Sequence, residues 1–368
     1  MWSPGCANSP NTNPMHHSLN QVRLAGLAVT VGSTTKDFIA EGLKLGRPAA
    51  QLERVARTIG LQQRQVTTPG VTALDLCENA TRRLLAAMDL DPASLDAIIF
   101  VTQTPDHSQP SNATILHGRL GLSTSAAAFD ISLGCSGWVY GLHQAALLCA
   151  HAGRVLLCAG DTLSCLTHPE DHAVHPLFGD AGSATILEKT GTPAPWHFCL
   201  GTDGTRASAI QVPVGGARQP AGSAPLPVIK DADGNSRRAD QLCMDGAEVF
   251  NFSLREVPPA VKVVMQMAQW TPQDADALIL HQANRFLVTR LGQKCGFPAD
   301  KVPADLVAKY GNQSSASVPA ALIQAYGSAL AERRLKIVGC GFGVGLSWGA
   351  FAAELGPCVT VPIEPYSP

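Results

Sequence analysis

The sequence predicts an α/β protein made of two similar halves, and two observations carry this prediction. Apolar, strand-like runs alternate with amphipathic helical stretches along the 368 residues, which is the pattern of α/β folds. A weak internal repeat also places corresponding strands and turns in each half. In the first half we expect strands at 22–31, 97–102, 154–159 and 183–187 and a helix at 73–88.

The internal repeat is anchored on two similar strands. The run DAIIFVTQ, which begins at Asp96, resembles DALILHQ, which begins at Asp276. After each come a helix, a glycine-marked turn into another helix, and a further apolar strand, at 155–159 in one half and 335–339 in the other. We therefore expect α/β halves at 22–190 and 191–368, preceded by a flexible tail at 1–21.

The repeat also predicts where the halves meet. The glycine-marked turn of the first half carries Cys135, and that of the second half carries Asn312. Halves packed about a pseudo-twofold axis would bring both turns together, along with His281 at the end of the strand that opens the second repeat. The sequence therefore predicts a site between the halves.

Composition excludes several classes of protein. Hydrophobic residues make up 45% of the chain and charged residues 15%, so a large dry interior is expected. The formal net charge of −2 argues against a dedicated nucleic-acid-binding protein, which needs a broad basic face. No apolar run approaches the ~20 residues of a membrane span.

Cysteine usage predicts a reduced environment. The eleven cysteines form no C-x-x-C pair, and the first twenty residues lack the basic and apolar regions of a secretion signal. Most of the cysteines, such as Cys149, Cys158 and Cys340, lie in apolar runs, where cysteine acts as a small buried hydrophobe. We therefore expect a cytoplasmic protein.

Cys135 differs from the other cysteines in its position. It lies in Gly134-Cys135-Ser136-Gly137, where a β-like run at 127–131 gives way to a helix-like run. A helix N-terminus offers unpaired N–H groups and a positive dipole end, which favour the nucleophilic thiolate. The glycines leave room for a substrate. A cysteine that only fills space at a tight turn is the alternative.

Two further stretches carry polar residues at similar turns. LILHQANRF places His281 at the end of a strand, and KYGNQSSASVPAAL places Asn312 on a glycine turn that enters a helix. Each has an ordinary structural reading, since a lone histidine is commonly a core residue and Asn after Gly is a turn former. Thioester exchange nevertheless suits Cys, and decarboxylation needs donors such as His and Asn aimed at a developing oxyanion.

Together these stretches resemble the β-ketoacyl-acyl-carrier-protein synthase III family of the thiolase superfamily. The resemblance runs from about residue 22 to residue 355 and rests on six motifs in the family's order: CSGWVYGL, FGDAGSA, MDGAEVF, HQAN, GNQSSASVP and GFGVGLSWG. It implies the thiolase-like fold, in which two similar α/β halves stack in five layers, αβαβα.

The resemblance implies a decarboxylative condensation that needs no cofactor. Cys135 matches the cysteine that takes an acyl group from a thioester of coenzyme A or acyl-carrier protein. His281 and Asn312 match the pair that holds the carbonyl oxygen of a malonyl-type or β-ketoacyl thioester as it becomes an enolate. Backbone N–H groups of Cys135 and Gly345 would form an oxyanion hole. The product would enter fatty-acid or polyketide-like specialised biosynthesis.

The residues expected to bind the adenine ring of coenzyme A differ from those of the family. Members with short coenzyme A primers hold the adenine ring between a tryptophan and an arginine; here those positions fall near Glu53 and Leu166. This loss favours a carrier-protein-bound or longer, specialised acyl donor. The resemblance places four residues on the pantetheine side, namely Arg57, Asn284, Phe250 and Phe286.

Basic residues after His281 are candidates for docking an acidic carrier protein, namely Arg285, Arg290 and Lys294. A solvated helix face is the alternative. The family implies a homodimer, and a heterodimer with a related subunit is also compatible.

The stretch THPEDHAVHP has a spacing that zinc could use, through His168, His172 and His175. No ligand-rich partner segment occurs elsewhere in the sequence. We therefore expect no metal, and interpret the stretch as a polar loop near the tunnel mouth or a dimer contact.

Two other functions are weighed against condensation. An acyltransferase on the same fold would pass the acyl group from Cys135 to an oxygen or nitrogen nucleophile; such relatives often alter the asparagine, and Asn312 is intact. A non-catalytic partner subunit would usually lose the cysteine or the histidine, and both are present.

Overall fold

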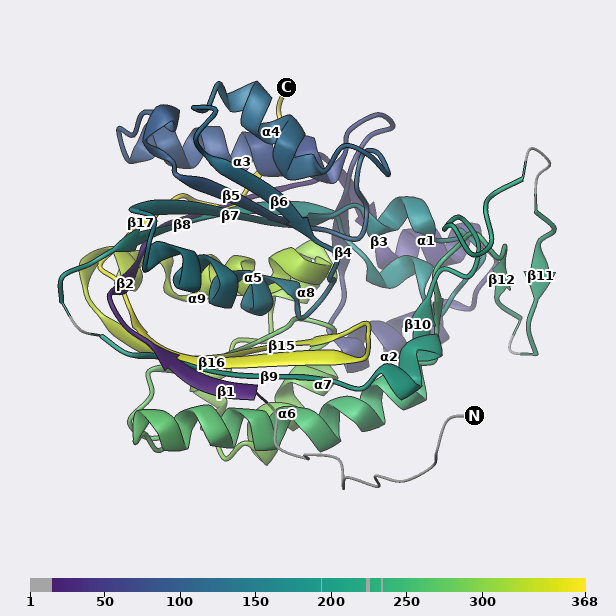
Figure 1. The fold of residues 1–368 in the computed structure, drawn as a ribbon. Helices are drawn as coiled ribbons and strands as arrows, with labels where there is room; N and C mark the ends of the chain where they lie inside the picture. Colours follow the sequence, from purple (N-terminus) through teal and green to yellow (C-terminus); the bar gives the residue numbers. More distant parts are fainter. Residues whose placement is uncertain (1–14, 193, 223–225, 233) are drawn as a thin grey trace, which may run out of the picture.

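Two β-sheets lie one above the other, with helices between them and on both outer faces (Figure 1). The structure is a computed structural model that describes residues 15–192, 194–222, 226–232 and 234–368. Its order of layers is α, β, α, β, α (Figure 1). The predicted five-layered α/β arrangement is therefore confirmed.

The sheet of the first half has seven strands in the order β17-β2-β8-β7-β5-β6, with β18 also paired to β2. Strand β5 reads AIIFV and is buried throughout, as expected for a strand covered on both faces. Helices α3 (Ala73–Ala87) and α4 (Asn112–Leu120) cover its outer face (Figure 1). The strands are β2 (Val22–Val31), β5 (Ala97–Val101), β6 (Ala127–Ile131), β7 (Arg154–Asp161), β8 (Ala181–Lys189), β17 (Val359–Thr360) and β18 (Glu364–Pro365).

The sheet of the second half has five strands in the order β1-β9-β16-β15-β14. Helices α6 (Gly246–Ala268) and α7 (Arg285–Lys294) cover its outer face (Figure 1). The repeated strands of the sequence are β5 and β14, and each is followed in its sheet by a parallel neighbour, β7 or β15. The strands are β1 (Met15–Leu19), β9 (Trp196–Thr202), β14 (Ala277–Leu280), β15 (Leu335–Gly343) and β16 (Ser347–Leu355).

The middle layer contains α5 (Gly137–Cys149), α9 (Ser317–Glu332) and the short α8 (Leu306–Tyr310) (Figure 1). Helix α5 reads GWVYGLHQAALLC and carries no Asp, Glu, Lys or Arg. A helix between two sheets has apolar neighbours on opposite sides, so an apolar stripe on one face would not suffice. This explains why the sequence of α5 is nearly free of polar periodicity.

The chain termini exchange between the halves, and this corrects the predicted tail at 1–21. Met15–Leu19 forms β1, which pairs antiparallel with β9 in the sheet of the second half. At the other end, β17 and β18 pair in parallel with β2 in the sheet of the first half. The sequence prediction failed because residues 15–19, MHHSL, form a short edge strand without a clear apolar alternation; residues 1–14 lie outside the described part.

The remaining elements gather on one side of the layers, at the right of Figure 1. Within the described ranges, no helix is long and apolar enough to cross a bilayer. These elements are α1 (Phe38–Lys44), α2 (Ala49–Ile59), the pair β3 (Thr34–Asp37) and β4 (Gln63–Val66), the pair β10 (Ile210–Gln211) and β13 (Cys243–Met244), and the projecting hairpin β11 (Ile229–Lys230) and β12 (Ser236–Arg237). Six 3₁₀ turns complete the described chain: η1 (Pro92–Ser94), η2 (Leu163–Leu166), η3 (His175–Leu177), η4 (Gly204–Ala209), η5 (Ala299–Lys301) and η6 (Ser314–Ala316).

Candidate active site

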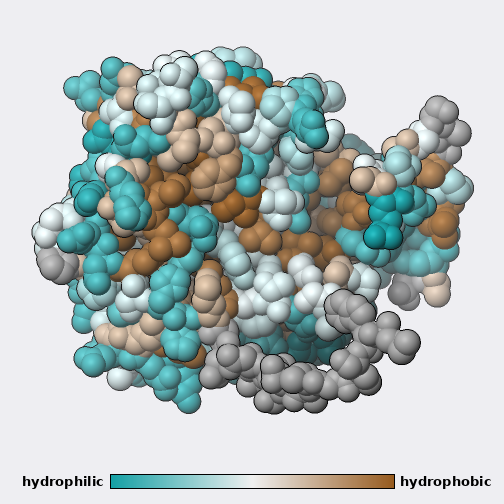
Figure 2. All heavy atoms as spheres, viewed as in Figure 1, coloured by the Kyte–Doolittle hydropathy of each residue, from teal (hydrophilic) through white to brown (hydrophobic). Residues whose placement is uncertain are grey.

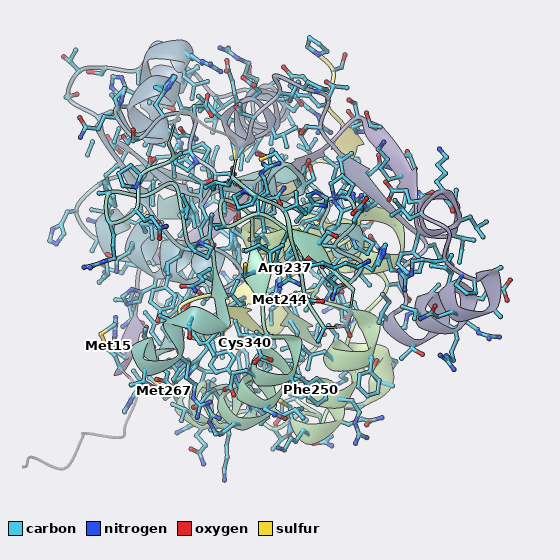
Figure 3. All side chains as sticks on the ribbon, turned by 90° about the vertical axis from the view of Figure 1, so that its right-hand side faces the viewer. Met15, Arg237, Met244, Phe250, Met267 and Cys340 are labelled. Atoms are coloured by element: carbon cyan, nitrogen blue, oxygen red, sulfur yellow. The ribbon has the colours of Figure 1, made fainter. Side chains whose placement is uncertain are left out.

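A cavity of about 670 Å³ joins the two halves on this side of the molecule. Cys135, His281 and Asn312 all line it, so the structure brings the three predicted catalytic residues to one space. Figure 3 looks onto this side, with Met244 of β13 near the centre and Phe250 of α6 below it, and both residues line the cavity. The rest of the lining is mostly apolar, from α1, α2, η3 and α6.

Cys135 stands at the turn between β6 and α5, as predicted. The turn is closed by a backbone hydrogen bond from Gly137 N to Gly134 O of 2.7 Å. Gly343 lies directly against the nucleophile: a Cβ there would come within 2.8 Å of Cys135 Cβ and 3.0 Å of its Sγ. Only glycine fits at this close approach, and the φ of Gly343, +157°, also suits glycine.

Burial controls the ionisation of this thiol. It raises the pKa of Cys135 to about 12, and the negative charge of Asp161 acts in the same direction. The Ser314 hydroxyl, with its oxygen 3.9 Å from Cys135 Sγ, lowers the pKa but does not outweigh the burial. Burial therefore opposes the thiolate that the helix N-terminus favours, because desolvation disfavours the charged form.

The backbone N–H groups of Cys135 itself and of Val344 lower the pKa of the thiol, which makes them the candidate donors beside the sulfur. The predicted second donor, Gly345, is off by one residue: Gly343 and Val344 line the cavity, whereas Gly345 does not. Gly345 instead folds back on Ser347, whose backbone N lies 2.9 Å from where its Cβ would be. A glycine-rich motif does not reveal which of its peptides points at a substrate, so the sequence could not settle this choice.

His281 follows β14 and is held at both its backbone and its ring. Its N–H donates to Cys340 O at 2.8 Å, and its Nδ1 lies 2.6 Å from Ser317 Oγ. The Ser314 backbone also hydrogen-bonds to the ring, and His281 lines the cavity. Burial lowers the pKa of His281 to about 3, so the imidazole is neutral at physiological pH.

Asn312 presents its amide in a fixed orientation. Its Oδ1 accepts a hydrogen bond from Ser314 N at 2.9 Å, which leaves the NH₂ group to act as a donor toward the cavity. Its backbone is pinned in both directions, by Asn312 N to Leu177 O at 2.8 Å and Gly179 N to Asn312 O at 3.0 Å. The preceding Gly311 has a φ of +76° and lies against the Arg64 side chain, where a Cβ would come within 2.9 Å of Arg64 Cβ.

Comparison with known proteins agrees with this geometry. Profiles described as 3-oxoacyl-[acyl-carrier-protein (ACP)] synthase III and as its C-terminal part match residues 129–204 and 265–355. A β-ketoacyl-[acyl-carrier-protein] synthase III of Caldanaerobacter subterraneus is 35% identical over 301 residues, covering 81% of this chain and 88% of that protein. One of Streptomyces coelicolor is 34% identical over 305 residues, covering 81% and 87%.

This chain belongs to the 3-oxoacyl-[acyl-carrier-protein] synthase III family. Its fold matches the crystal structure of a 3-oxoacyl-(acyl-carrier protein) synthase from Burkholderia xenovorans with a TM-score of 0.89 at 36% identity, covering 96% of this chain and all of that one. The chain is therefore a thiolase-fold condensing enzyme of the acyltransferase class, and the predicted family, fold and enzyme class are confirmed.

The residues predicted on the pantetheine side of the enzyme fall into two groups. Asn284 and Phe250 line the cavity, and Asn284 Oδ1 also caps α7 by accepting from Leu287 N at 2.8 Å. Phe286 stacks on Phe250 at 5.9 Å with an interplanar angle of 13°, but it is exposed and does not line the cavity. Arg57 is also exposed and off the lining, because α2 turns Gln51, Val55 and Ile59 inward instead.

The three basic residues predicted to dock a carrier differ in their availability. Arg285 forms an ion pair with Asp305 at 2.7 Å and packs where a Cβ on Gly60 would come within 2.5 Å of Arg285 Cβ, so it is engaged within the protein. Lys294 is exposed and donates to Leu254 O at 2.9 Å. Arg290 is exposed and has a 3.3 Å contact to Gln293.

The histidine-rich stretch lies beside the cavity. His172 lines it, whereas His175 is occupied on both ring nitrogens, by Thr167 Oγ1 at 2.8 Å and an Arg64 guanidinium nitrogen at 3.0 Å. Across the described ranges no three His, Cys, Asp or Glu side chains are grouped as metal ligands. His172, Ala173 and Pro176 make part of this stretch a wall of the cavity.

Sequence reasoning missed several lining residues. Arg47, Gln51 and Asn235 add polar groups to the cavity from segments with no recognisable motif. Val344 and Ser314 lie inside quoted motifs, but only the fold shows that they lie beside the nucleophile.

Proposed function

We propose that the enzyme loads an acyl group from a pantetheine-linked thioester onto Cys135 and condenses it with a malonyl-type thioester. The observation that carries this proposal is that Cys135, His281 and Asn312 line one cavity, with two candidate backbone N–H donors beside the sulfur. No step in this sequence needs a cofactor, because the thioester itself supplies the activated acyl group.

In the first step, Cys135 Sγ attacks the thioester carbonyl and the pantetheine thiol leaves. The N–H groups of Cys135 and Val344 are the donors for the oxyanion of this tetrahedral intermediate, since both lie beside the sulfur. Donors fixed in the backbone need no reorganisation as the charge develops.

In the second step, the malonyl-type thioester loses CO₂ and its carbonyl oxygen becomes an enolate. The Asn312 amide and the His281 imidazole are the donors for that oxygen, since both line the cavity and Asn312 Oδ1 is already occupied by Ser314 N. A neutral histidine suits this role, because it donates without being a strong acid. The enolate carbon then attacks the acyl-cysteine and forms the new carbon–carbon bond.

We propose an acyl-carrier protein rather than coenzyme A as the preferred donor. Arg57 does not line the cavity, and neither Glu53 nor Leu166 supplies the aromatic–guanidinium sandwich for adenine. Arg290 and Lys294 are the exposed cations left to attract an acidic carrier, while Arg285 is engaged with Asp305. The product would enter fatty-acid or specialised biosynthesis.

We further propose a cytoplasmic homodimer. The ten cysteines in the described part of the chain are free thiols. Strand β6 ends its sheet with an open edge, and its Phe129 is 38% exposed. Apolar side chains gather on the face of Figure 2 at the height of α5 and α9, which is typical of a surface that a partner covers.

Intact-protein mass spectrometry with matched acyl-carrier-protein and coenzyme A thioesters tests the proposal. We expect a single acyl adduct on Cys135, faster loading from the carrier, and release of CO₂ once malonyl thioester is added. The carrier preference should weaken at high salt, since exposed charges are screened beyond ~8 Å at physiological ionic strength. Equal use of coenzyme A would contradict the donor assignment. Transfer to an alcohol or amine without CO₂ release would identify an acyltransferase instead.

A further inference from the structure

Arg64 is a buried cation to which the loading and condensation steps assign no role. It lies in β4, and its side chain is 3% exposed. Its guanidinium donates to both carboxylate oxygens of Glu41 on α1, at 3.0 and 3.2 Å, and to the backbone oxygen of Phe178 at 3.1 Å. Because the donors of a guanidinium form a rigid fork, the groups that they bind are held in a fixed relation to one another.

The histidine-rich stretch supplies a third acceptor for Arg64. Arg64 Nη2 lies 3.0 Å from His175 Nε2, and His175 Nδ1 lies 2.8 Å from Thr167 Oγ1. The Thr167 hydroxyl donates to Ser164 O at 2.9 Å, so it accepts from Nδ1, and Nε2 is the acceptor for Arg64. Burial and the charge of Arg64 lower the pKa of His175 to about 4, which keeps this ring neutral and able to accept.

The contact with Phe178 reaches the catalytic turn through a single peptide group. The oxygen of Phe178 and the N–H of Gly179 belong to one peptide unit, which is planar. Arg64 binds the oxygen, and Gly179 N donates to Asn312 O at 3.0 Å. The segment is tightly packed, since a Cβ on Gly179 would come within 1.9 Å of Tyr310 O. The orientation of this peptide therefore decides where the backbone of Asn312 is held.

We propose that Arg64 is a positioning residue for the decarboxylation step, and that it holds the Asn312 amide in place through the Phe178–Gly179 peptide. Arg64 does not line the cavity, so it acts on the reaction through Asn312. A donor must lie within hydrogen-bond distance of the developing oxyanion, and a displacement of ~1 Å can cost ~10²-fold in rate. The proposal rests on the proposed condensation, in which Asn312 is a donor for the enolate oxygen.

Arg64→Gln tests this role, because it removes both the charge and the fork. Glu41, whose side chain is 24% exposed, can regain water in this variant. We expect malonyl decarboxylation to slow ~10–10²-fold while acyl loading of Cys135 stays within about threefold. Arg64→Lys should give a smaller loss, since an ammonium can pair with Glu41 but cannot reproduce the fork that also binds Phe178 O. CO₂ release and intact-protein mass spectrometry measure the two steps.

A double-mutant cycle separates positioning from general stabilisation. In an Asn312→Ala background, Arg64→Gln should slow decarboxylation by no more than about threefold further, because the amide that Arg64 positions is gone. Arg154→Gln is the matched control. The Arg154 guanidinium also binds a carboxylate, that of Glu188 at 2.6 Å, and Ser94 Oγ at 2.7 Å, and none of the three residues lines the cavity. Its loss should leave both steps within about threefold of the original enzyme.

Two results would overturn the proposal through the kinetics. Fully additive losses in the double variant would show that Arg64 does not act through Asn312. Equal losses of loading and decarboxylation in Arg64→Gln, or no loss of decarboxylation, would show that Arg64 has no selective effect on the second step. If Arg64→Gln does not fold, the same cycle with Arg64→Lys decides.

Hydrogen exchange of the Gly179 and Asn312 backbone N–H groups tests the contact without any substrate. Both N–H groups should exchange faster in Arg64→Gln than in Arg154→Gln, because the peptide between them and Arg64 is no longer held. Unchanged exchange would overturn the proposal. Faster exchange in an enzyme that releases no CO₂ from malonyl thioester, even when unmodified, would contradict the proposed function and leave the positioning of Asn312 by Arg64 supported.

Discussion

The two turns that meet at the cavity have the same topology and different chemistry. In the first half, the turn at Cys135 leads directly into α5, with Gly137 as its first helical residue. In the second half, the turn at Asn312 passes through η6 before α9 begins at Ser317. The first turn places the Cys135 thiol beside backbone N–H donors. The second turn contains an additional 3₁₀ segment and presents hydrogen-bonding side chains to the cavity.

The difference shows how a duplicated fold divides one reaction between its halves. In the proposed reaction, the first half supplies Cys135 as the atom that becomes acylated, and the second half supplies His281 and Asn312 as the donors for the enolate; all three line the cavity. Ser314 of η6 is the place where they touch, because it contacts Cys135 of the other half. Each turn can therefore be disabled separately, and the two losses should differ in kind.

The largest effect is expected at the first turn. Cys135→Ala should abolish the acyl adduct entirely, because no other cysteine in the described part of the chain lines the cavity. Intact mass spectrometry measures the adduct. Cys165→Ala, which removes an exposed thiol elsewhere, should load normally. A stoichiometric adduct in Cys135→Ala would show that another residue is acylated and would contradict the different roles assigned to the two turns.

At the second turn we expect a partial and selective loss. Asn312→Ala and His281→Ala should each slow malonyl decarboxylation by ~10²–10³, the cost of one oxyanion donor, while Cys135 still accepts an acyl group. Loading by mass spectrometry and CO₂ release measure the two steps in the same variants. Equal losses in both steps would indicate collapse of the site rather than divided labour.

The contact between the halves at Gly343 should be sensitive to a single methyl group. Gly343→Ala places a carbon about 2.8 Å from Cys135 Cβ, and overpacking of this kind costs ~1–3 kcal/mol. Thermal denaturation should show the loss, and acyl loading should slow with it. Gly216→Ala, where an added Cβ meets nothing within 4 Å, is the control and should unfold like the original protein. If Gly343→Ala were as stable as the original protein, the packing between the two turns would have room for a methyl group.

Lowering the pH should reduce the free energy of unfolding, because His281 gains a proton more readily in the unfolded chain. The folded pKa of His281 is about 3 against ~6.5 unfolded, so the unfolded chain gains a proton first as pH falls. The free energy of unfolding is not reduced by His281 above pH ~6.5. Below that pH it falls by about 1.4 kcal/mol per pH unit, which amounts to ~2 kcal/mol by pH 5. Melting curves at pH 7 and pH 5 should differ less in His281→Gln. His143 and His175, whose pKa values burial lowers to about 4, keep some acid sensitivity in that variant. An unchanged difference would show that His281 is protonated in the fold.

The local sequence predicted which residues stand at the two turns, but it did not predict how the two halves pack against each other there. Cys135, His281 and Asn312 were predictable because each follows a strand or glycine turn that the motifs mark. Gly345 was the wrong oxyanion donor, since peptide orientation in the β15–β16 turn depends on how that turn packs on Cys135. The raised pKa of Cys135 could not be predicted for a similar reason: the helix end is visible in the local sequence, whereas the burial that raises the pKa depends on the fold.

The exchange of chain ends between the sheets has a consequence for the order in which the protein is made. A ribosome releases the strands of the first half long before residues 359–365, which add β17 and β18 beside β2. Strand β1 is made first and must wait for β9 before it has a partner. The sheet of the second half has all its strands once β16 has been made, whereas the sheet of the first half gains β17 and β18 only afterwards. Asn312 and Val344, which line the cavity, are also made after every strand of the first half except β17 and β18.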